Sequence, residues 1–246
     1  MSQPILKLKN ITKRYPGSKN LALNNVSLDV QEGEVLALLG INGAGKTTLS
    51  SLIGTLHPCT EGTILFRGKP VMDNIIEYRK KVGFCAQSPN LDGVLNVEQN
   101  LTFAGKYFGV DKKILQGRVE KLIEFFDLQP YRTSAIDELS GGFKRRVLIA
   151  REMVHEPDIM ILDEPTVALD PGVRKKIWEI IKQLKAVGKT VILTTHYIEE
   201  AEILADRVCI LDAGKIKLID TPENLKNLHS QAKLEEIFVK LTEEPG

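Results

Sequence analysis

The chain has 246 residues, of which 43% are hydrophobic and 26% charged, and its 33 basic and 32 acidic side chains leave a net charge of +1. This length suits one large domain, or a domain with a lobe inserted into it, and the balanced charge gives no basic footprint for nucleic acid. No apolar run approaches the roughly 18 residues of a membrane-spanning helix, and no signal peptide opens the chain. We therefore expect a cytosolic protein with no membrane span and no nucleic-acid partner.

The first seventy or so residues carry patterns that are typical of short strands. Hydrophobic and polar residues alternate over 5–11 and 21–30, and a third strand is predicted over 61–68, with turn residues between them. We expect these strands to form an N-terminal antiparallel β layer from residues of about 1–35 and 60–70.

The segment Gly40–Thr48 is the most informative stretch of the chain. It reads GINGAGKTT and fits the phosphate-binding pattern G-x-x-x-x-G-K-[ST]. The apolar run 35–39 before it predicts a buried parallel strand, and 48–53 after it can begin a helix. This order places backbone N–H groups and a helix N-terminus around one anion. The alternative is a glycine-rich turn that matches the pattern by chance, and such a turn would need neither the strand before it nor the helix after it.

The glycine loop predicts the contacts of a nucleoside triphosphate. Lys46 should reach the β- and γ-phosphates, and Thr47 should place its hydroxyl on Mg²⁺. The expected phosphate-binding residues of the loop are Gly40, Asn42, Gly43, Ala44, Gly45, Lys46, Thr47 and Thr48.

A helical region is predicted in the middle of the chain. Apolar residues recur with a period near that of an α-helix over 97–108 and over 111–126. We expect an all-helical lobe of residues from about 90–155, inserted into an α/β core. Two basic clusters, at 144–146 and 174–176, are expected to be solvated faces of helices.

An α/β core resumes after this lobe. Apolar runs over 158–163, 190–194 and 207–211 predict strands, and 171–187 predicts a helix that begins with Pro and is followed by Gly188. Strands that alternate with helices form a parallel sheet that is covered on both faces.

These elements define the expected fold class. It is α/β, a P-loop NTPase core with a mostly parallel sheet, an N-terminal antiparallel β layer and an inserted helical lobe, all within one nucleotide-binding domain of residues 1–246. Tail helices are expected over about 222–242, including an amphipathic helix at 231–241.

Two acidic residues close the predicted strand 158–163. Asp163 ends the strand and can hold Mg²⁺, and Glu164 can orient or deprotonate an attacking water. An acidic pair at a strand end is by itself more often a helix cap or a solvated edge. Beside the glycine loop, the pair indicates triphosphate hydrolysis, with Glu164 and Lys46 as catalytic residues.

The segment Leu139-Ser-Gly-Gly-Phe143, followed by Lys-Arg-Arg, lies shortly before the strand that ends at Asp163. This order resembles the signature of the ATP-binding-cassette (ABC) ATPases, and Asp163-Glu-Pro-Thr166 resembles their second nucleotide motif. The resemblance runs from about Leu6 to the end of the chain. It implies that ATP and Mg²⁺ are the bound cofactors.

The resemblance also implies roles for single residues. Tyr15 resembles the aromatic residue that stacks on adenine, and His196 resembles the catalytic histidine that contacts the γ-phosphate. Gln87 resembles the glutamine that links the two lobes, and it is expected at the nucleotide and its metal. Alternatives remain for each, since Tyr15 could be a strand aromatic, Gln87 a loop residue and His196 an inert histidine.

A dimer follows from the same resemblance. Ser140, Gly141 and Gly142 begin a helix and suit a phosphate, yet the family places this turn on the ATP of the opposite subunit. Two chains in head-to-tail order, as a homodimer or a heterodimer, would bury two ATP molecules, with Asp170 in the loop that faces the partner. Phe143 stands where the family's commonest signature has Gln, and we expect it to pack the helical lobe.

The segment 233–242 resembles the tail of cassettes that serve ABC-2-type exporters. It implies an ATP-hydrolysing subunit on the cytosolic face of the cell membrane that powers a separate integral membrane permease through ATP-driven dimer closure. We expect the permease to dock near 87–97. The alternative is a soluble ABC ATPase in DNA repair or translation, although such proteins usually carry second cassettes, zinc motifs or basic extensions.

Overall fold

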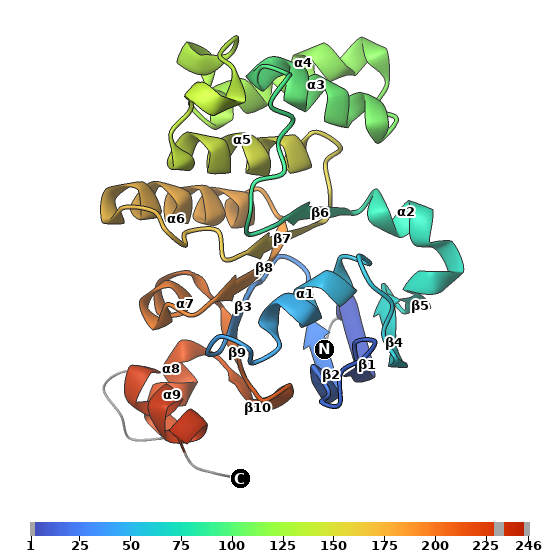
Figure 1. Cartoon of the computed structure of the whole chain (residues 1–246), viewed down its shortest axis with the longest axis vertical. Coiled ribbons are helices and arrows are strands. Elements are labelled where there is room, and N and C mark those ends of the chain that lie inside the picture. Colours follow the sequence, from blue (N-terminus) through green and yellow to red (C-terminus); the bar gives the residue numbers. More distant parts are fainter. Residues whose placement is uncertain (1–2, 229–233, 244–246) are drawn as a thin grey trace.

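The computed structural model describes residues 3–228 and 234–243 (Figure 1). Its N-terminal part is a four-stranded antiparallel sheet with the order β2-β1-β4-β5. The strands are β1 (Leu6–Lys13), β2 (Leu23–Val30), β4 (Glu61–Phe66) and β5 (Lys69–Pro70). Alternate side chains of β1 and β2 are buried, which is the expected consequence of a two-residue side-chain period over one covered face.

The second sheet has six strands in the order β10-β9-β3-β8-β7-β6. The strands are β3 (Val35–Leu39), β6 (Val82–Cys85), β7 (Ile159–Asp163), β8 (Thr190–Thr195), β9 (Arg207–Asp212) and β10 (Lys215–Asp220). All neighbours in this sheet are parallel except β10, which runs antiparallel to β9. Because both faces are covered, all five residues of β3 and all five of β7 are buried.

The register of the central strands brings three carboxyl ends level. Leu38 of β3 pairs with Thr194 of β8, and Thr194 pairs in turn with Asp163 of β7. The loops that leave β3, β7 and β8 therefore start from the same edge of the sheet, where parallel α/β sheets bind their ligands.

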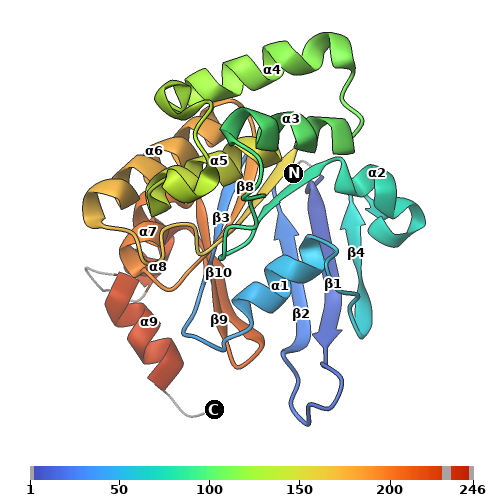
Figure 2. The same cartoon turned by 45° about the horizontal axis from the view of Figure 1, so that its top comes forward.

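Nine helices cover the sheets within the described residues. They are α1 (Lys46–Ile53), α2 (Ile75–Arg79), α3 (Val97–Tyr107), α4 (Lys112–Phe125), α5 (Gly141–Met153), α6 (Pro171–Ala186), α7 (Ile198–Leu204), α8 (Pro222–Leu228) and α9 (Leu234–Glu243). Figures 1 and 2 show α1 between the two sheets, α6 along the six-stranded sheet, and α3 and α4 beyond α5 at the far end of the molecule.

The helical region around α3, α4 and α5 shares one core with the sheet. Leu101, Val119 and Val147, one from each helix, are fully buried in the cluster that also contains Val191 of β8. A capping box of Asn96 and Gln99 starts α3. The segment between α4 and α5 is less helical than the sequence predicts: it holds only two short 3₁₀ turns, and Asn96 forms an isolated bridge with Ala135.

The C-terminal helix packs against the sheet. Leu234, Ile237 and Phe238 of α9 are buried in a cluster with Val208 and Ile210 of β9. The predicted amphipathic helix at 231–241 is thus observed from Leu234 onward, and its first three residues lie outside the described part of the chain.

The predicted fold class is confirmed: an α/β core with a mostly parallel sheet, an antiparallel β layer and an inserted group of helices. The sequence patterns predicted no strand for β5, β6 or β10 and no helix for α2 or α7, all of which are seven residues or shorter. Within the described residues, every helix is too short or too polar to span a lipid bilayer.

Candidate nucleotide-binding site

The glycine loop lies between β3 and α1 and lines a cleft of about 550 Å³. Gly43 and Gly45 both adopt left-handed backbone angles, with φ of 87° and 107°. A Cβ on Gly45 would also lie 2.9 Å from the carbonyl oxygen of Ala22, so this position accepts glycine alone. The cleft is lined by Ala22, Asn42, Gly43, Gly45, Lys46, Thr47, Thr48, Gln87, Glu164, Val167 and His196.

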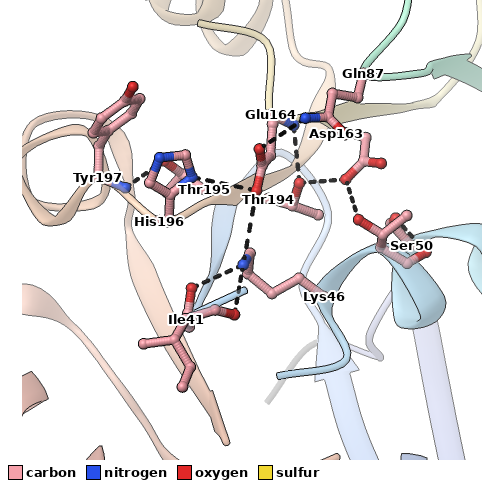
Figure 3. Close-up of polar contacts among 12 residues, drawn as sticks. Ile41, Lys46, Ser50, Gln87, Asp163, Glu164, Thr194, Thr195, His196 and Tyr197 are labelled. Carbon is pink, nitrogen blue, oxygen red and sulfur yellow. Dashed lines mark hydrogen bonds and ion pairs between the residues drawn. The ribbon is translucent and has the colours of Figure 1, made fainter. Parts of the chain in front are cut away.

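Lys46 is the cation at the floor of the cleft, and its side chain is only 4% exposed. Its Nζ donates to the backbone oxygens of Gly40 at 2.8 Å and Ile41 at 3.1 Å, and it lies 3.8 Å from Oε1 of Glu164 (Figure 3). Burial lowers the pKa of Lys46, and the nearby carboxylates of Glu164 and Asp163 oppose this shift. In the structure, two carbonyl dipoles and Glu164 provide the negative charge around this ammonium group. A bound phosphate group would provide it instead.

Asp163, at the end of β7, is bound by two hydroxyl groups. Its Oδ1 accepts hydrogen bonds from Oγ1 of Thr194 at 2.5 Å and from Oγ1 of Thr47 at 3.2 Å. Burial raises the pKa of Asp163, and these two hydrogen bonds lower it. The level ends of β7 and β8 bring Asp163 and Thr194 together, and the first turn of α1 adds Thr47.

Thr47 and Asp163 form an oxygen donor pair that suits Mg²⁺, a cation that prefers a carboxylate with phosphate and water oxygens. Among the described residues, no group of three or more His, Cys, Asp or Glu side chains could hold a metal ion by itself.

Glu164 is held on both oxygens of its carboxylate. Nε2 of Gln87 donates to Oε2 at 3.2 Å, and Nδ1 of His196 lies 3.3 Å from Oε1 (Figure 3). Its backbone N–H donates to the side chain of Thr194 at 2.9 Å, and its φ of +45° is left-handed. A non-glycine residue in this conformation is strained, which is common where a side chain is aimed at chemistry. The structure therefore brings together Gln87, Glu164 and His196, which lie far apart in the sequence.

The loop after Glu164 is joined to α6 and α7 through a buried carboxylate that no motif in the sequence had indicated. Oε1 of Glu200, a residue with no exposed surface, accepts hydrogen bonds from Thr166 Oγ1 and from Trp178 Nε1, both at 2.8 Å. Trp178 is itself buried. These contacts fix the chain between Glu164 and Asp170.

Several expected cofactor-binding residues do not line this cleft. Gly40 and Ala44 are buried in the glycine loop, and half-buried Tyr15 contacts its rim, where its hydroxyl lies 3.4 Å from Oγ1 of Thr48. Exposed Ser140 and Gly141 begin α5, and exposed Asp170 precedes α6.

The start of α5 packs closely on the chain that follows Glu164. A Cβ on Gly142 would lie 2.4 Å from Cγ1 of Val173, and one on Gly141 would lie 3.5 Å from Cδ2 of Leu169. The Ser140–Gly142 turn and Asp170 therefore share one surface. Phe143 packs on the helical core and its ring lies 4.2 Å from that of Tyr131, as predicted for this position.

One expectation about basic residues is wrong. Arg145 and Arg146 were predicted to be on a solvated helix face, but they are only 4% and 7% exposed. Arg145 donates to the backbone oxygens of Ala86 at 2.8 Å and Gln87 at 2.6 Å. The pattern of charges along α5 could not reveal this, because both acceptors are backbone atoms about sixty residues away. In the other cluster, Lys175 and Lys176 are exposed.

The strand, glycine loop, helix and strand-end carboxylates define a P-loop nucleoside triphosphatase. A family profile described as "ABC transporter" matches residues 23–167, more than half of the chain. The chain belongs to the ABC transporter family, and it is an ATP-hydrolysing subunit of a transporter.

Known proteins agree with this placement. The "Nod factor export ATP-binding protein I" of Cupriavidus metallidurans is 42% identical over 212 residues, which cover 86% of this chain and 69% of that protein. The solved structure of an "ATP binding subunit of ABC transporter" has a TM-score of 0.85 and 30% identity, and the match covers 96% of this chain and 99% of that one.

A second solved structure is a dimeric post-hydrolysis state of an ATP-binding cassette bound to ADP and Pi. It has a TM-score of 0.79 and 31% identity, over 88% of this chain and 98% of that one. These comparisons give no support to the alternative of a soluble ABC ATPase in DNA repair or translation.

Proposed function

We propose that this chain is the cytosolic ATPase of an exporter, in which two cassettes close on two ATP molecules and so move a separate integral membrane permease. The observation that carries the proposal is the convergence of Lys46, Gln87 and His196 on the carboxylate of Glu164. The name of the Cupriavidus relative supports export as the direction of transport.

The residues of the cleft have distinct roles in this proposal. Lys46 and the N–H groups of the glycine loop bind the β- and γ-phosphates. Thr47 and Asp163 would hold Mg²⁺, and Gln87 would contact it as well. The bound metal would neutralise the charge of the phosphates. Tyr15 stacks on the base.

Hydrolysis in this proposal uses Glu164 as the general base. Its carboxylate accepts a proton from the water that attacks the γ-phosphorus, while the bond from that phosphorus to the bridging oxygen of ADP breaks. Gln87 and His196 hold the carboxylate in place, and His196 also contacts the γ-phosphate. The charge on Lys46 stabilises the negative charge that the phosphoryl oxygens carry.

The partner cassette completes each site. Ser140, Gly141 and Gly142 contribute a helix N-terminus to the ATP of the other subunit, and Asp170 lies in the facing loop. Support comes from the structure, in which Ser140, Gly141 and Asp170 are exposed and do not line the cleft of their own chain. The one intact set of motifs permits two equivalent sites, in a homodimer or in a heterodimer with a second cassette.

A groove between the end of α1, α2, β6 and the helical region is the proposed docking site of the permease. The segment 87–97, where docking was expected from the sequence, contributes no residue to this groove. The groove has a volume of about 660 Å³ and is lined mostly by apolar surface that includes Leu56, Ile76, Phe84, Tyr107 and Phe108. Ile76 and Tyr107 are 67% and 77% exposed. Such exposed apolar side chains mark a surface that binds another protein.

Substitution Glu164→Gln tests the proposed chemistry. The amide keeps the shape of the carboxylate but cannot accept the proton, so we expect ATP binding to be retained while hydrolysis falls at least about 100-fold. The ATP-loaded variant should elute as a dimer in size-exclusion chromatography with light scattering, and Lys46→Ala should abolish both binding and dimer. A Glu164→Gln protein that hydrolyses ATP at the wild-type rate, or stays monomeric with ATP and permease present, would refute the proposal.

A further inference from the structure

Arg145, on α5, is a buried cation with an unusual set of partners. Its guanidinium donates from Nη1 to the carbonyl oxygen of Ala86 at 2.8 Å and from Nη2 to that of Gln87 at 2.6 Å. No carboxylate forms an ion pair with it among the described residues. A charge buried without a counter-ion is expensive, and two charge-assisted hydrogen bonds to adjacent carbonyls offset that cost.

The two carbonyls belong to the segment that presents Gln87. Ala86 and Gln87 directly follow β6, at the start of the irregular segment that leads to α3. The side chain of Gln87 donates to Oε2 of Glu164 at 3.2 Å. A shift of the backbone at Gln87 by about 1 Å would break this contact, because hydrogen bonds weaken steeply with distance. Arg145 therefore fixes the backbone of Gln87, the residue whose side chain holds Glu164.

The same helix carries the turn that faces the partner. Arg145 lies in the second turn of α5, which begins at Gly141 directly after Ser140. An α-helix is rigid over this distance, so a displacement of the Ser140–Gly142 turn moves Arg145 with it.

We propose that Arg145 is a positioning residue that ties Gln87 to α5, so that a displacement of the first turn of α5, which docks on the partner's ATP, shifts the side chain that holds Glu164. This inference rests on the proposed function of the dimer. It assigns to one buried arginine the mechanical link between the two ATP sites.

Arg146 supplies a matched control. It is the next residue on α5 and is similarly buried, at 7% exposed. Its contacts, however, stay within the helical region: Nη1 donates to the carbonyl of Phe126 at 3.3 Å and lies 3.4 Å from Oδ2 of Asp127. Loss of either arginine removes a buried charge, but only loss of Arg145 releases Gln87.

The first test measures ATP-dependent dimer formation in the Glu164→Gln background. We expect Arg145→Met to raise the ATP concentration at half-maximal dimer about tenfold, as two lost charge-assisted hydrogen bonds allow, and Arg146→Met to change it less than about twofold. Nucleotide affinity of the monomer should stay the same. If the Glu164→Gln dimer itself does not form, the proposed function fails; if it forms and Arg145→Met leaves it unchanged, only the present inference fails.

The second test is a double-mutant cycle on the turnover rate. Arg145→Met should lower kcat about tenfold in the wild-type chain and less than about twofold in the Gln87→Ala chain, because a residue that acts through Gln87 has nothing left to position. Arg145→Lys should restore part of the rate. It replaces Arg145→Met in the cycle if the Met variant does not fold. Equal losses in both backgrounds, or no loss in the wild type, overturn the inference.

Discussion

At the scale of single residues, Thr194 links the two acidic residues of the site. Its hydroxyl donates to Asp163 at 2.5 Å and accepts from the backbone N–H of Glu164 at 2.9 Å. One hydroxyl therefore sets the positions of Asp163, the proposed metal-binding acid, and Glu164, the proposed general base. The apolar run at 190–194 predicts a buried strand but gives no sign that its last threonine belongs to the site.

Substitution Thr194→Val should move the acid limb of the pH–rate profile to higher pH. Burial raises the pKa of Asp163 and the hydroxyl of Thr194 lowers it, so removal of the hydroxyl raises the pKa further. A larger fraction of Asp163 is then protonated at a given low pH, and protonated Asp163 binds Mg²⁺ poorly. We expect kcat/KM near neutral pH to fall about tenfold, whereas Thr194→Ser should keep the wild-type profile. Superimposable profiles for the Val variant and the wild type would contradict this role.

At the scale of elements, α3 is joined to the segment between α4 and α5 by one ion pair. Arg132 binds Glu98 at the start of α3 through Nε at 2.8 Å and Nη2 at 2.6 Å. The side-chain hydrogen bonds from Arg132 and then Gln116 hold the pKa of Glu98 at about 2. Backbone bonds run beside the pair, from Glu98 N to Arg132 O and from Val97 N to Ser134 O. The pair therefore stabilises the docking of α3.

The ion pair predicts a defined acid sensitivity. The pKa of Glu98 is lower in the folded chain than its ordinary value of 4.5, so its contribution to stability is full above pH 4.5 and is lost as the pH falls towards 2. Glu98→Gln should flatten this part of the curve of unfolding free energy against pH, measured by urea denaturation. Glu120→Gln is the control, since that carboxylate lies 3.7 Å from Arg132 and is 54% exposed. An unchanged pH dependence in the Glu98 variant would show that the pair contributes nothing to folding.

At the scale of the whole molecule, the site for the nucleotide and the groove proposed for the permease are separate surfaces that β6 and the residues directly after it connect. Gln87, the second residue after β6, lines the nucleotide site, and Phe84 of β6 lines the groove. A permease in the groove would therefore contact the strand that leads directly into the Gln87 segment.

Substitution Tyr107→Ser should separate the two surfaces in function. We expect it to reduce co-purification of the cognate permease at least about fivefold, because an exposed aromatic anchor is lost from the groove, while ATP hydrolysis by the isolated chain stays within about twofold. Ile114→Ser, at a 48% exposed position of α4 outside the groove, is the control. Retention of the permease by the Tyr107 variant would place its docking surface elsewhere.

The sequence by itself determined the parts of this protein that are local. The glycine loop is a contiguous motif whose backbone angles need glycine, and continuous apolar runs predict strands that are buried on both faces, so the fold class and the residues from Gly40 to Thr48 could be predicted. The elements β5, β6, β10, α2 and α7 were not predicted, because such short segments show too little hydrophobic periodicity. The tertiary structure alone decided which distant groups meet: the level ends of β7 and β8 join Asp163 to Thr194, and the packing of α5 on the sheet buries Arg145 against two carbonyls. Such contacts depend on strand register and on the positions of backbone acceptors. The residue types of β7, β8 and α5 do not determine either of these.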